Sequence, residues 1–436
     1  DDQDTVWEKT FGVADVERGT PMKLATRFKL GSIAKVFTAL EIMCLVEEDR
    51  VELDAPVTNY VPGFTIRTRF PDARPITIRD LLTHRSGLPR NGNLPTWYWD
   101  AGQHVLRDLT RSVRDSYAAF PPGQRFKYSN LGYVLLGQVI DALRGGGFPY
   151  HMERELLRPI GMRDSVFLKQ RLPEGEPVAL GYAPSDGGPT PLNQSDIIGM
   201  PSGNLYGTLG DLARFVKFLF RGGDDVIRAE TLASMYEVQH RRPEDPQELG
   251  LCWFTERRAL GEKTVFHSGI CQGTYTFLAF LPDRRLGAIM TANSTAFVDL
   301  APRAVFEALE LMREAKCGVA THDRFAGKYI AEGEVIEFRS DDGELRASGR
   351  GHDLDLTRLN GSRYLLEHWL IDIGQLDVEF FPEHDLLLLT VEGSYRITCP
   401  RYPEIETIPP LWHKLAGNYT VRPRVKSTYW STEDLG

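Results

Sequence analysis

A serine hydroxyl and a lysine amine lie three residues apart at Ser32 and Lys35, inside the apolar run GSIAKVFTALEIMCLV. The apolar neighbours predict a helix that is buried on nearly every side. Positions i and i+3 share one face of a helix, so the two side chains can meet. A buried lysine tends to lose its proton, and a neutral amine beside a serine can act as a general base. Because so short a pattern also arises by chance, it needs support from other residues.

A second pair of reactive side chains is Tyr128 and Asn130, in the segment PPGQRFKYSNLGYVLLG. A Pro-Gly loop delivers both residues just before an apolar helix, where side chains can project into a cleft. A tyrosine near a lysine ammonium can have its pKa lowered and serve as a base or proton shuttle. Asn130 offers a donor and an acceptor that suit a substrate amide. The alternative is an ordinary helix start, capped by Ser129 or Asn130.

The third group is His267-Ser268-Gly269, at the end of the first of three predicted strands. We expect Gly269 to let a substrate lie against the strand edge, with Ser268 and Ile270 as further substrate-binding residues. The backbone N–H groups of Ile270 and Ser32 can then form an oxyanion hole. The alternative for His267 is a hydrogen-bonded structural residue in a strand.

Strands and helices must position these groups. Residues 5–15 and 26–31 predict a strand and the approach to the Ser32 helix, and Thr77 is expected to cap a short helix within 76–89. Further helices are expected over 102–117, 129–144, 150–158 and 296–315, and strands over 264–269, 274–281 and 285–293. The last helix is amphipathic and able to cover the sheet that the three strands form.

The composition is that of a globular protein with two domains. Its 436 residues exceed the size at which a single core usually stops growing, and 42% apolar with 25% charged residues is ordinary. A net charge of -9 without a basic run argues against nucleic acid as a partner. No window approaches the apolar length of a membrane span. The five cysteines lack disulfide or zinc-ligand spacing, so no metal or other cofactor is expected.

The compartment is left open by the sequence. The chain begins at Asp1 without a methionine or a signal-peptide pattern, so we expect a removed targeting segment or a trimmed sequence. Cysteines that are odd in number and widely spaced are expected to be buried free thiols, which favours a reducing compartment such as the cytoplasm. A periplasmic or secreted location fits if a signal peptide was removed.

The residues after Cys317 have a different pattern. Apolar and polar residues alternate with a period of two, between DDG, NGS and EGS turns. After a domain over 1–316 and a linker at 317–324, this pattern predicts a small antiparallel, lipocalin-like β-barrel over 325–411. Residues 415–419 echo the start of this module, so 412–436 are expected to be its closing strand or the truncated start of a second β module.

The three motifs, in this order, resemble the penicillin-recognising serine hydrolases, a superfamily of β-lactamases, D,D-peptidases, D-aminopeptidases and related esterases. Ser-x-x-Lys is a signature of this group, and Tyr-x-Asn at 128–130 matches its class C β-lactamase branch. The stretch ITIRDLLTHRSGLP also matches, which implies an architectural role for His84. The resemblance spans about residues 5–316. It implies an α+β, β-lactamase-like fold of an antiparallel sheet flanked by helices plus a helical subdomain, whose first strand and helix are expected before Asp1.

The resemblance also implies roles for the residues in a reaction through an acyl-enzyme. Ser32 is the expected nucleophile, and Lys35 and Tyr128 share the removal of its proton and the return of that proton to the leaving group. Asn130 is expected to orient the substrate. His267 is expected to support charge or proton traffic near Tyr128.

The third motif bears on the substrate. His267-Ser268-Gly269 stands where class C β-lactamases carry Lys-Thr-Gly, and it resembles the motif of D-aminopeptidases and several esterases. We expect a peptidase or amidase that acts on small peptides, including those with a D-residue. Carboxylesterase activity is the next alternative and β-lactamase activity the third, whereas a catalytically silent peptide-binding protein is the alternative from another class. Small peptides, amides or esters are the expected partners, and a homo-oligomer is left open.

Overall fold

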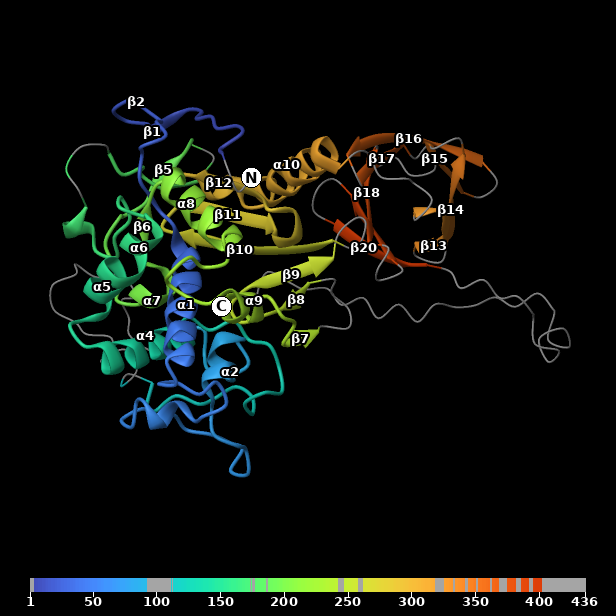
Figure 1. The fold of residues 1–436 in the computed structure, drawn as a ribbon. Coiled ribbons are helices and arrows are strands. Elements are labelled where there is room, and N and C mark those ends of the chain that lie inside the picture. Colours follow the sequence, from blue (N-terminus) through green and yellow to red (C-terminus); the bar gives the residue numbers. More distant parts are fainter. Residues whose placement is uncertain are drawn as a thin grey trace, which may run out of the picture.

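The apolar run around Lys35 forms α1 (Ala34–Glu47), the helix at the centre of the first domain (Figure 1). Every side chain from Ala34 to Leu45 is buried, which confirms the predicted buried helix. Ser32 lies in the short 3-10 turn η1 (Gly31–Ile33), which leads directly into α1. The expected position of Ser32 at the start of the helix is therefore confirmed.

The computed structural model describes most of the first domain and the strands of the second. The described residues are 4–91, 111, 113–172, 174, 177–185, 187–241, 247–257, 262–317, 325–331, 334–341, 344–349, 352–360, 363–367, 375–381, 386–391 and 395–401. The predictions for residues 412–436, for 102–110 and for 112 lie outside this part of the chain.

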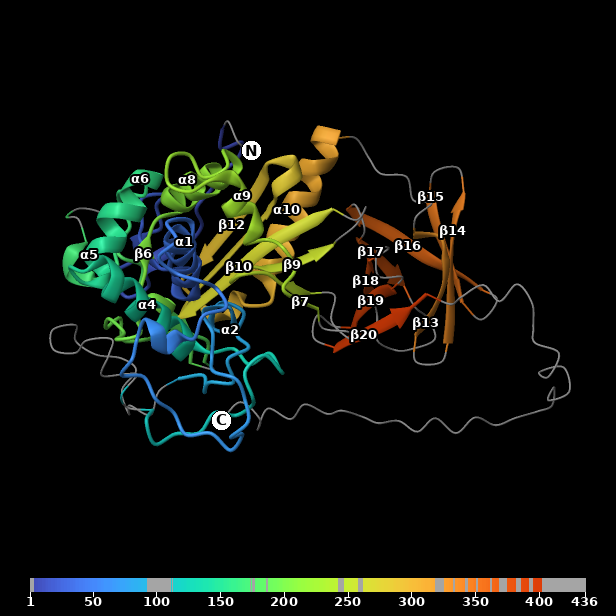
Figure 2. The same cartoon turned by 60° about the horizontal axis from the view of Figure 1, so that its bottom comes forward.

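A six-stranded antiparallel sheet lies beside α1, in the order β12-β11-β10-β9-β8-β7. Its strands are β7 (His240–Arg241), β8 (Glu248–Leu249), β9 (Phe254–Arg257), β10 (Lys263–Cys271), β11 (Thr274–Leu281) and β12 (Leu286–Ala292). The three strands predicted after residue 264 are thus confirmed. Val265 and Leu278 belong to the core around α1, whereas Phe266 and Phe277 belong to a second core beneath α10 (Leu300–Cys317). Helices therefore cover both faces of the sheet (Figure 2).

Further helices surround the other sides of α1. They are α2 (Ile78–Leu82), α4 (Asn130–Arg144), α5 (Phe148–His151), α6 (Arg158–Ile160), α7 (Met200–Gly203), α8 (Leu209–Phe220) and α9 (Ala229–Ser234). A π-helical segment, η3 (Met152–Leu157), joins α5 to α6, so the helix predicted over 150–158 is continuous. Thr77 caps α2, as expected, and shares a reciprocal capping box with Asp80. No helix in the described ranges is long and apolar enough to cross a membrane.

The short elements complete the first domain. They are β1 (Val13–Asp15), β2 (Thr20–Pro21), β3 (Phe28–Lys29), β4 (Tyr182–Ala183), β5 (Thr190–Pro191), β6 (Tyr206–Gly207), η2 (Val57–Asn59), η4 (Lys169–Arg171), η6 (Pro282–Arg284) and η7 (Thr295–Phe297). Strand β3, immediately before the Ser32 turn, pairs with β6.

Two predictions of local structure are wrong. Of the described residues in the predicted helix 102–117, Arg111 is helical, but residues 113–116 form turns and a bend and Tyr117 bridges to Arg67. The amide of Arg67 donates to the carbonyl of Ser116, and the amide of Ala118 donates to the carbonyl of Arg67, which requires an extended backbone. The strand predicted over 5–15 is limited to Val13–Asp15, where β2 supplies a hydrogen-bonded partner.

The second domain is an eight-stranded antiparallel sheet in sequential order. Its strands are β13 (Gly327–Ala331), β14 (Glu334–Asp341), β15 (Glu344–Gly349), β16 (His352–Asn360), β17 (Arg363–Glu367), β18 (Gln375–Phe381), β19 (Leu386–Val391) and β20 (Tyr395–Pro400). Tyr329 of the first strand bridges to Arg401 just after the last strand, so the sheet nearly closes into a barrel around its own apolar core. The predicted fold class, a β-lactamase-like α+β domain followed by an antiparallel barrel, is confirmed.

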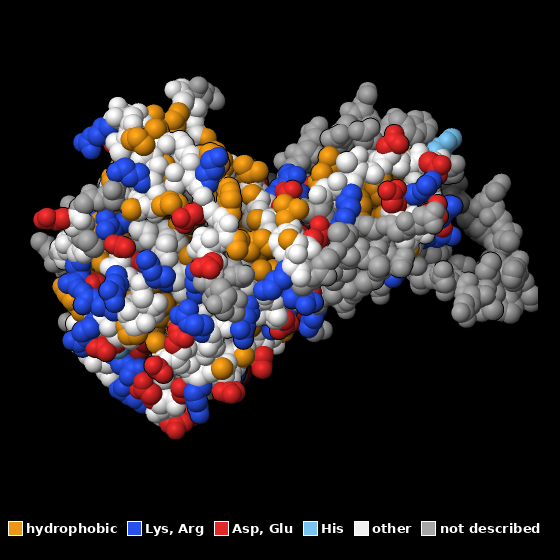
Figure 3. Space-filling model, turned by 45° about the horizontal axis from the view of Figure 1, so that its top comes forward, with side chains coloured by type: hydrophobic (Ala, Val, Ile, Leu, Met, Phe, Trp, Pro, Cys, Tyr) orange, Lys and Arg blue, Asp and Glu red, His pale blue; other side chains and the backbone are white. Residues whose placement is uncertain are grey.

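Helix α10 connects the two domains. Arg303 donates to Asp377 of β18 at 2.8 Å, and Arg358 of β16 pairs with Glu314 near the end of α10. Hydrophobic side chains gather on the face of the first domain nearest the β domain, whereas charged side chains of both signs are interspersed elsewhere on this view (Figure 3). The two ion pairs tie α10 to the barrel.

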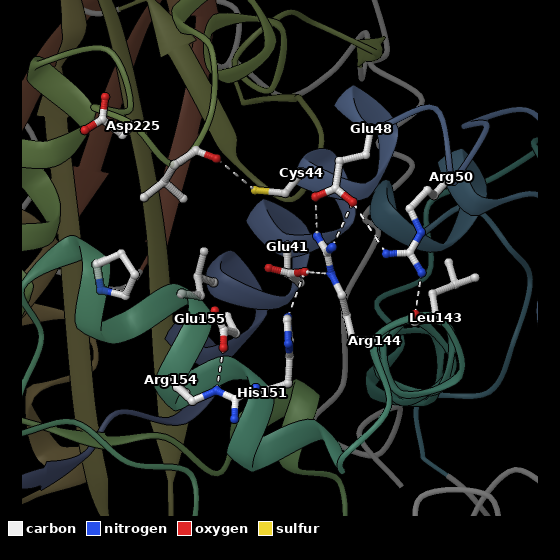
Figure 4. A pocket seen from close by; sticks show the side chains of 13 residues that line it. Glu41, Cys44, Glu48, Arg50, Leu143, Arg144, His151, Arg154, Glu155 and Asp225 are labelled. Carbon is white, nitrogen blue, oxygen red and sulfur yellow. Dashed lines mark hydrogen bonds and ion pairs between the residues drawn. The ribbon is translucent and has the colours of Figure 1, made fainter.

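A buried carboxylate ties the second half of α1 to the neighbouring helices. Glu41 is 2% exposed; it accepts a hydrogen bond from Arg144 Nε at 2.7 Å and lies 2.9 Å from His151 Nε2. Arg144 also donates two hydrogen bonds to Glu48. These residues line a hollow of about 500 Å³ that none of the catalytic candidates lines (Figure 4). The network therefore serves to anchor α4 and α5 to α1.

Replacing Glu41 by alanine should lower the free energy of unfolding by about 3 kcal/mol, because it removes the buried carboxylate oxygen that Arg144 Nε and His151 Nε2 share. Glu48→Ala is the matched control, since Glu48 binds the same arginine but its side chain is 42% exposed. That variant should lose less than about 1 kcal/mol. Urea unfolding followed by tryptophan fluorescence measures both losses, and equal losses would contradict the anchoring role of Glu41.

Candidate active site

The side chains of Ser32 and Lys35 meet, as their spacing predicts. Lys35 Nζ lies 3.1 Å from Ser32 Oγ, 2.7 Å from Asn130 Oδ1 and 2.6 Å from the carbonyl oxygen of Ser202. Both Asn130 Oδ1 and the Ser202 carbonyl can only accept. A neutral amine has two hydrogens, which these two acceptors take up. Its lone pair then faces the Ser32 hydroxyl, which is the geometry of a general base.

The lysine is set up to lose its proton near neutral pH. Lys35 has no exposed surface. Burial lowers its pKa to about 7, the nearby Cys252 opposes this shift, and the positive charge of Arg90 adds to it. The buried amine makes no ion pair with a carboxylate within the described residues, and hydrogen bonds to neutral oxygens favour the charged form less than a carboxylate does.

Tyr128 joins the pair from the start of α4. Its ring centroid lies 4.9 Å from Lys35 Nζ, and its side chain is hydrogen-bonded to that of Ser32. The prediction that Lys35 lowers the pKa of Tyr128 is wrong: burial raises this pKa, and the hydrogen bond with Ser32 only partly offsets the shift. The phenol therefore stays protonated at neutral pH, where it can donate a hydrogen bond or a proton.

His84 holds the tyrosine in place. Its ring stacks on that of Tyr128 with centroids 4.2 Å apart and planes inclined by 29°. His84 Nδ1 accepts a hydrogen bond from the backbone N–H of Ser129 at 3.1 Å. Burial lowers the pKa of His84 well below its usual value, so the imidazole is neutral. These contacts fit the architectural role expected for His84.

His267 lies on the face of β10 that packs toward α1. Its Nδ1 is 2.7 Å from the carbonyl oxygen of Ser268, so Nδ1 carries the hydrogen and Nε2 carries the lone pair. Burial and the charge of Lys35 lower the pKa of His267 to about 3. A neutral imidazole cannot supply positive charge near neutral pH. Of the two roles expected for His267, only the handling of a proton or hydrogen bond fits this geometry.

Among the described residues, no strand pairs with β10 beyond Phe266 on the side of β9, so this edge is open there. Strand β9 pairs with β10 only as far as Phe266, whereas β11 pairs with β10 up to Cys271. Gln272 and Gly273 form the two-residue turn between β10 and β11, and both have positive φ, at 46° and 83°. The residues that flank such a turn form a hydrogen-bonded pair, so by alternation the N–H of Ile270 points to the open edge.

Glycines allow this edge to approach the nucleophile. A Cβ at Gly269 would lie 2.1 Å from the carbonyl oxygen of Leu30 and 3.0 Å from Ser32 N, and a Cβ at Gly31 would lie 2.7 Å from Ile270 N. The reason predicted for Gly269, room for a substrate, is therefore corrected: the glycine makes room for the Ser32 turn. The backbone of the Ser32 turn is therefore packed against that of Gly269 and Ile270, which is the placement that an oxyanion hole built from the Ser32 and Ile270 amides requires.

The structure brings further residues to the site that sequence reasoning missed. Asn130 Nδ2 donates to Asn91 Oδ1 at 2.8 Å, which together with Lys35 fixes the orientation of the Asn130 amide. The carbonyl of Ser202, from α7, is a direct partner of Lys35. Asn91 follows the stretch that resembles the hydrolases, which was a usable signal, but nothing in the sequence pointed to Ser202. No group of His, Cys, Asp and Glu within the described ranges could hold a metal ion.

Comparison with known proteins identifies the family of the first domain. A family model described as Beta-lactamase matches residues 1–311. The chain is similar to the unguisins hydrolase ungD' of Aspergillus campestris, with 28% identity over 305 residues that cover 66% of this chain and 56% of that protein. It is also similar to the protein flp of Staphylococcus aureus, with 27% identity over 65% of this chain and 56% of the relative. The chain thus spans little more than half the length of these relatives.

Solved structures extend the likeness to the second domain. The octameric penicillin-binding protein homologue from Pyrococcus abyssi is 28% identical with a TM-score of 0.63, over 91% of this chain and 93% of that one. The D-amino acid amidase from Ochrobactrum anthropi has a TM-score of 0.57 at 24% identity, over 70% of this chain and 90% of its own, and this likeness shows the fold. Because the family match extends over residues 1–311, the chain belongs to the beta-lactamase family of serine hydrolases.

Proposed function

We propose that this protein cleaves small peptides or amides, including those with a D-residue, through an acyl-enzyme on Ser32. The observation that supports this best is the lone pair of Lys35, which the hydrogen bonds to Asn130 and Ser202 direct at the Ser32 hydroxyl. Ser32 Oγ attacks the substrate carbonyl and its proton passes to Lys35. The amides of Ser32 and Ile270 hold the oxyanion of the tetrahedral intermediate.

The second half of the cycle uses the tyrosine. The proton held by Lys35 passes through Tyr128 to the nitrogen or oxygen of the leaving group as its bond to the acyl carbon breaks. A water molecule then attacks the acyl-enzyme and gives up its proton along the same path, which frees the acid product and restores the Ser32 hydroxyl. Asn130 orients the acyl group, and neutral His267 accepts or relays a hydrogen bond beside Tyr128.

A peptide is favoured over a simple ester by the open edge of β10. An extended chain can add to such an edge as a further strand, and the N–H of Ser268 supplies a backbone donor for that pairing besides the Ile270 amide, which holds the oxyanion. An ester without peptide bonds gains only the oxyanion contact. The hydrolase name of the Aspergillus relative supports the reaction class. Carboxylesterase activity is the second candidate, because the acyl-transfer machinery cleaves activated esters as well.

Two measurements test the proposal. A fluorophosphonate probe should label the wild-type chain at Ser32, located by peptide mass spectrometry; absence of labelling would favour the catalytically silent peptide-binding alternative. Turnover of D- and L-aminoacyl anilides, a nitrophenyl ester and a cephalosporin then ranks the substrates. Cleavage of the ester with no anilide turnover would defeat the peptidase assignment and leave the esterase one.

We extend the proposal to self-association, which the octameric state of the Pyrococcus homologue supports. Light scattering should give a mass that is a multiple of the 49.2 kDa of one chain. A mass of one chain at micromolar concentration would contradict it.

A further inference from the structure

Arg90 is a charged residue at the rim of the site, and it takes no part in the catalytic steps described above. Its side chain is exposed, and its guanidinium carbon lies 5.4 Å from the centroid of the Tyr128 ring. Burial is the largest cause of the lowered pKa of Lys35, and the positive charge of Arg90 lowers it further. The guanidinium is therefore part of the electrostatic surroundings of the catalytic pair while it still faces solvent.

The backbone around Arg90 is fixed to the start of α4. The Ser129 hydroxyl donates to the carbonyl that precedes Arg90 at 2.8 Å. The amides of Asn130 and Leu131 donate to the carbonyl of Arg90 itself, at 2.8 and 3.2 Å. The next side chain, Asn91, accepts from Asn130 Nδ2. Each residue of the segment 89–91 is thus bonded to the turn that carries Tyr128 and Asn130, so the backbone of Arg90 cannot move away from the tyrosine without breaking several hydrogen bonds.

Arg90 lacks an acidic partner within the described part of the chain, where its contact is the Tyr128 ring. Other arginines of the same region are paired: Arg74 binds Asp80 and Arg79 binds Asp54. An arginine whose backbone is fixed, whose guanidinium lies over a catalytic ring and which pairs with no described carboxylate is suited to a carboxylate from outside, which it can bind through two parallel hydrogen bonds.

We propose that Arg90 binds a carboxylate on the leaving group of the substrate and so selects substrates with an anionic leaving group. Peptides whose scissile bond is followed by a single residue with a free C-terminal carboxylate have this chemistry. The inference rests on the proposed function, in which Tyr128 returns the proton to the leaving group. Because the atom that accepts this proton must lie beside the Tyr128 hydroxyl, a carboxylate a few bonds away comes within reach of the guanidinium over the same ring.

Two esters with one acyl group test the proposal. Phenylacetyl esters of 3-hydroxybenzoate and 3-hydroxybenzamide differ only in the charge of the leaving group, and each kcat/KM is divided by the alkaline hydrolysis rate of the same ester. The wild type should prefer the carboxylate ester by about tenfold or more, as expected for a hydrogen-bonded charge pair. Arg90→Gln should bring this ratio close to one, and Arg90→Lys should retain part of it. Added salt should lower the wild-type ratio.

Arg125→Gln is the matched control. It removes the same charge from an exposed arginine that lies over a different ring, that of Phe120 at 5.1 Å, and it should leave the ratio unchanged. The uncharged ester reports the active fraction of each preparation, so a variant that folds poorly still gives a valid ratio. A wild-type ratio near one, or a ratio that survives in Arg90→Gln, would overturn the role of Arg90 and leave the hydrolase intact. Failure to turn over either ester, without labelling of Ser32, would overturn both.

Discussion

Replacing Ser32 by alanine should lower kcat/KM on the best substrate by about ten-thousandfold or more and abolish labelling by a fluorophosphonate. The size of the loss follows from the role of the residue: without a nucleophile no acyl-enzyme forms, and the oxyanion hole and Lys35 can only assist direct attack by water. Ser32 is half-buried in a turn and its hydroxyl is bonded to Lys35 and Tyr128, so the substitution removes little packing.

The measurement is steady-state hydrolysis combined with mass spectrometry of the quenched reaction. The wild type should show the mass of the acyl group on the peptide that contains Ser32, and Ser32→Ala should not. Ser234→Ala is a control of the same chemistry, since that hydroxyl donates to the Thr231 carbonyl in α9, and it should keep full activity. More than about 1% residual activity in Ser32→Ala, or an acyl adduct on another residue, would rule out the proposed nucleophile.

What the sequence could predict of the site is its local geometry. The meeting of Ser32 and Lys35 follows from an i, i+3 spacing within one run of helix, which needs no knowledge of the rest of the chain. The three strands and the barrel could be predicted for the same reason, because the alternation of apolar and polar residues and the turn residues are local properties of the sequence. The helix predicted over 102–117 failed at residues 113–117, where pairing with the distant Arg67 overrides local preference.

What the sequence could not predict depends on contacts between distant segments. The pKa of Tyr128 is raised because His84 and other side chains, far along the chain, exclude water from it; spacing to a lysine says nothing of that. Gly269 was assigned to the substrate because its contact with the Leu30 carbonyl arises only when β10 packs on the Ser32 turn. The Ser202 carbonyl, which orients Lys35, carries no side-chain signature at all.

Replacing Lys35 by methionine should lower kcat/KM by about a thousandfold or more and remove its dependence on pH below 7, because it removes the general base. With a lysine pKa of about 7, the wild-type kcat/KM should fall about tenfold for each pH unit below 7 and be constant above it. His267, with a pKa of about 3, does not titrate in this range. Tyr128, with its raised pKa, should extend the plateau beyond about pH 10.

Lys29→Met is the matched control for this substitution. Lys29 is also fully buried, its Nζ donates to the Ser195 carbonyl and to Gln272 Oε1, both at 2.6 Å, and burial also lowers its pKa. It makes no hydrogen bond with Ser32, so its loss should leave the acidic limb of the profile in place. Pre-steady-state acylation rates between about pH 5 and 9 measure the limb directly. An unchanged limb in Lys35→Met would assign the base to another group.

The stability of the same variant gives an independent check on the state of Lys35. The folded chain binds the lysine proton less tightly than the unfolded chain, with a pKa of about 7 against 10.5. The unfolded state therefore holds more protons between these two values, so the free energy of unfolding should rise with pH across this window and stay lowest below it. Lys35→Met should lose the part of this pH dependence that Lys35 contributes. Lys29→Met should lose only the part that Lys29 contributes, because burial lowers the pKa of that lysine as well. A wild-type stability that is flat from about pH 7 to 10 would mean that Lys35 stays charged in the fold, and with it the general-base role would fall.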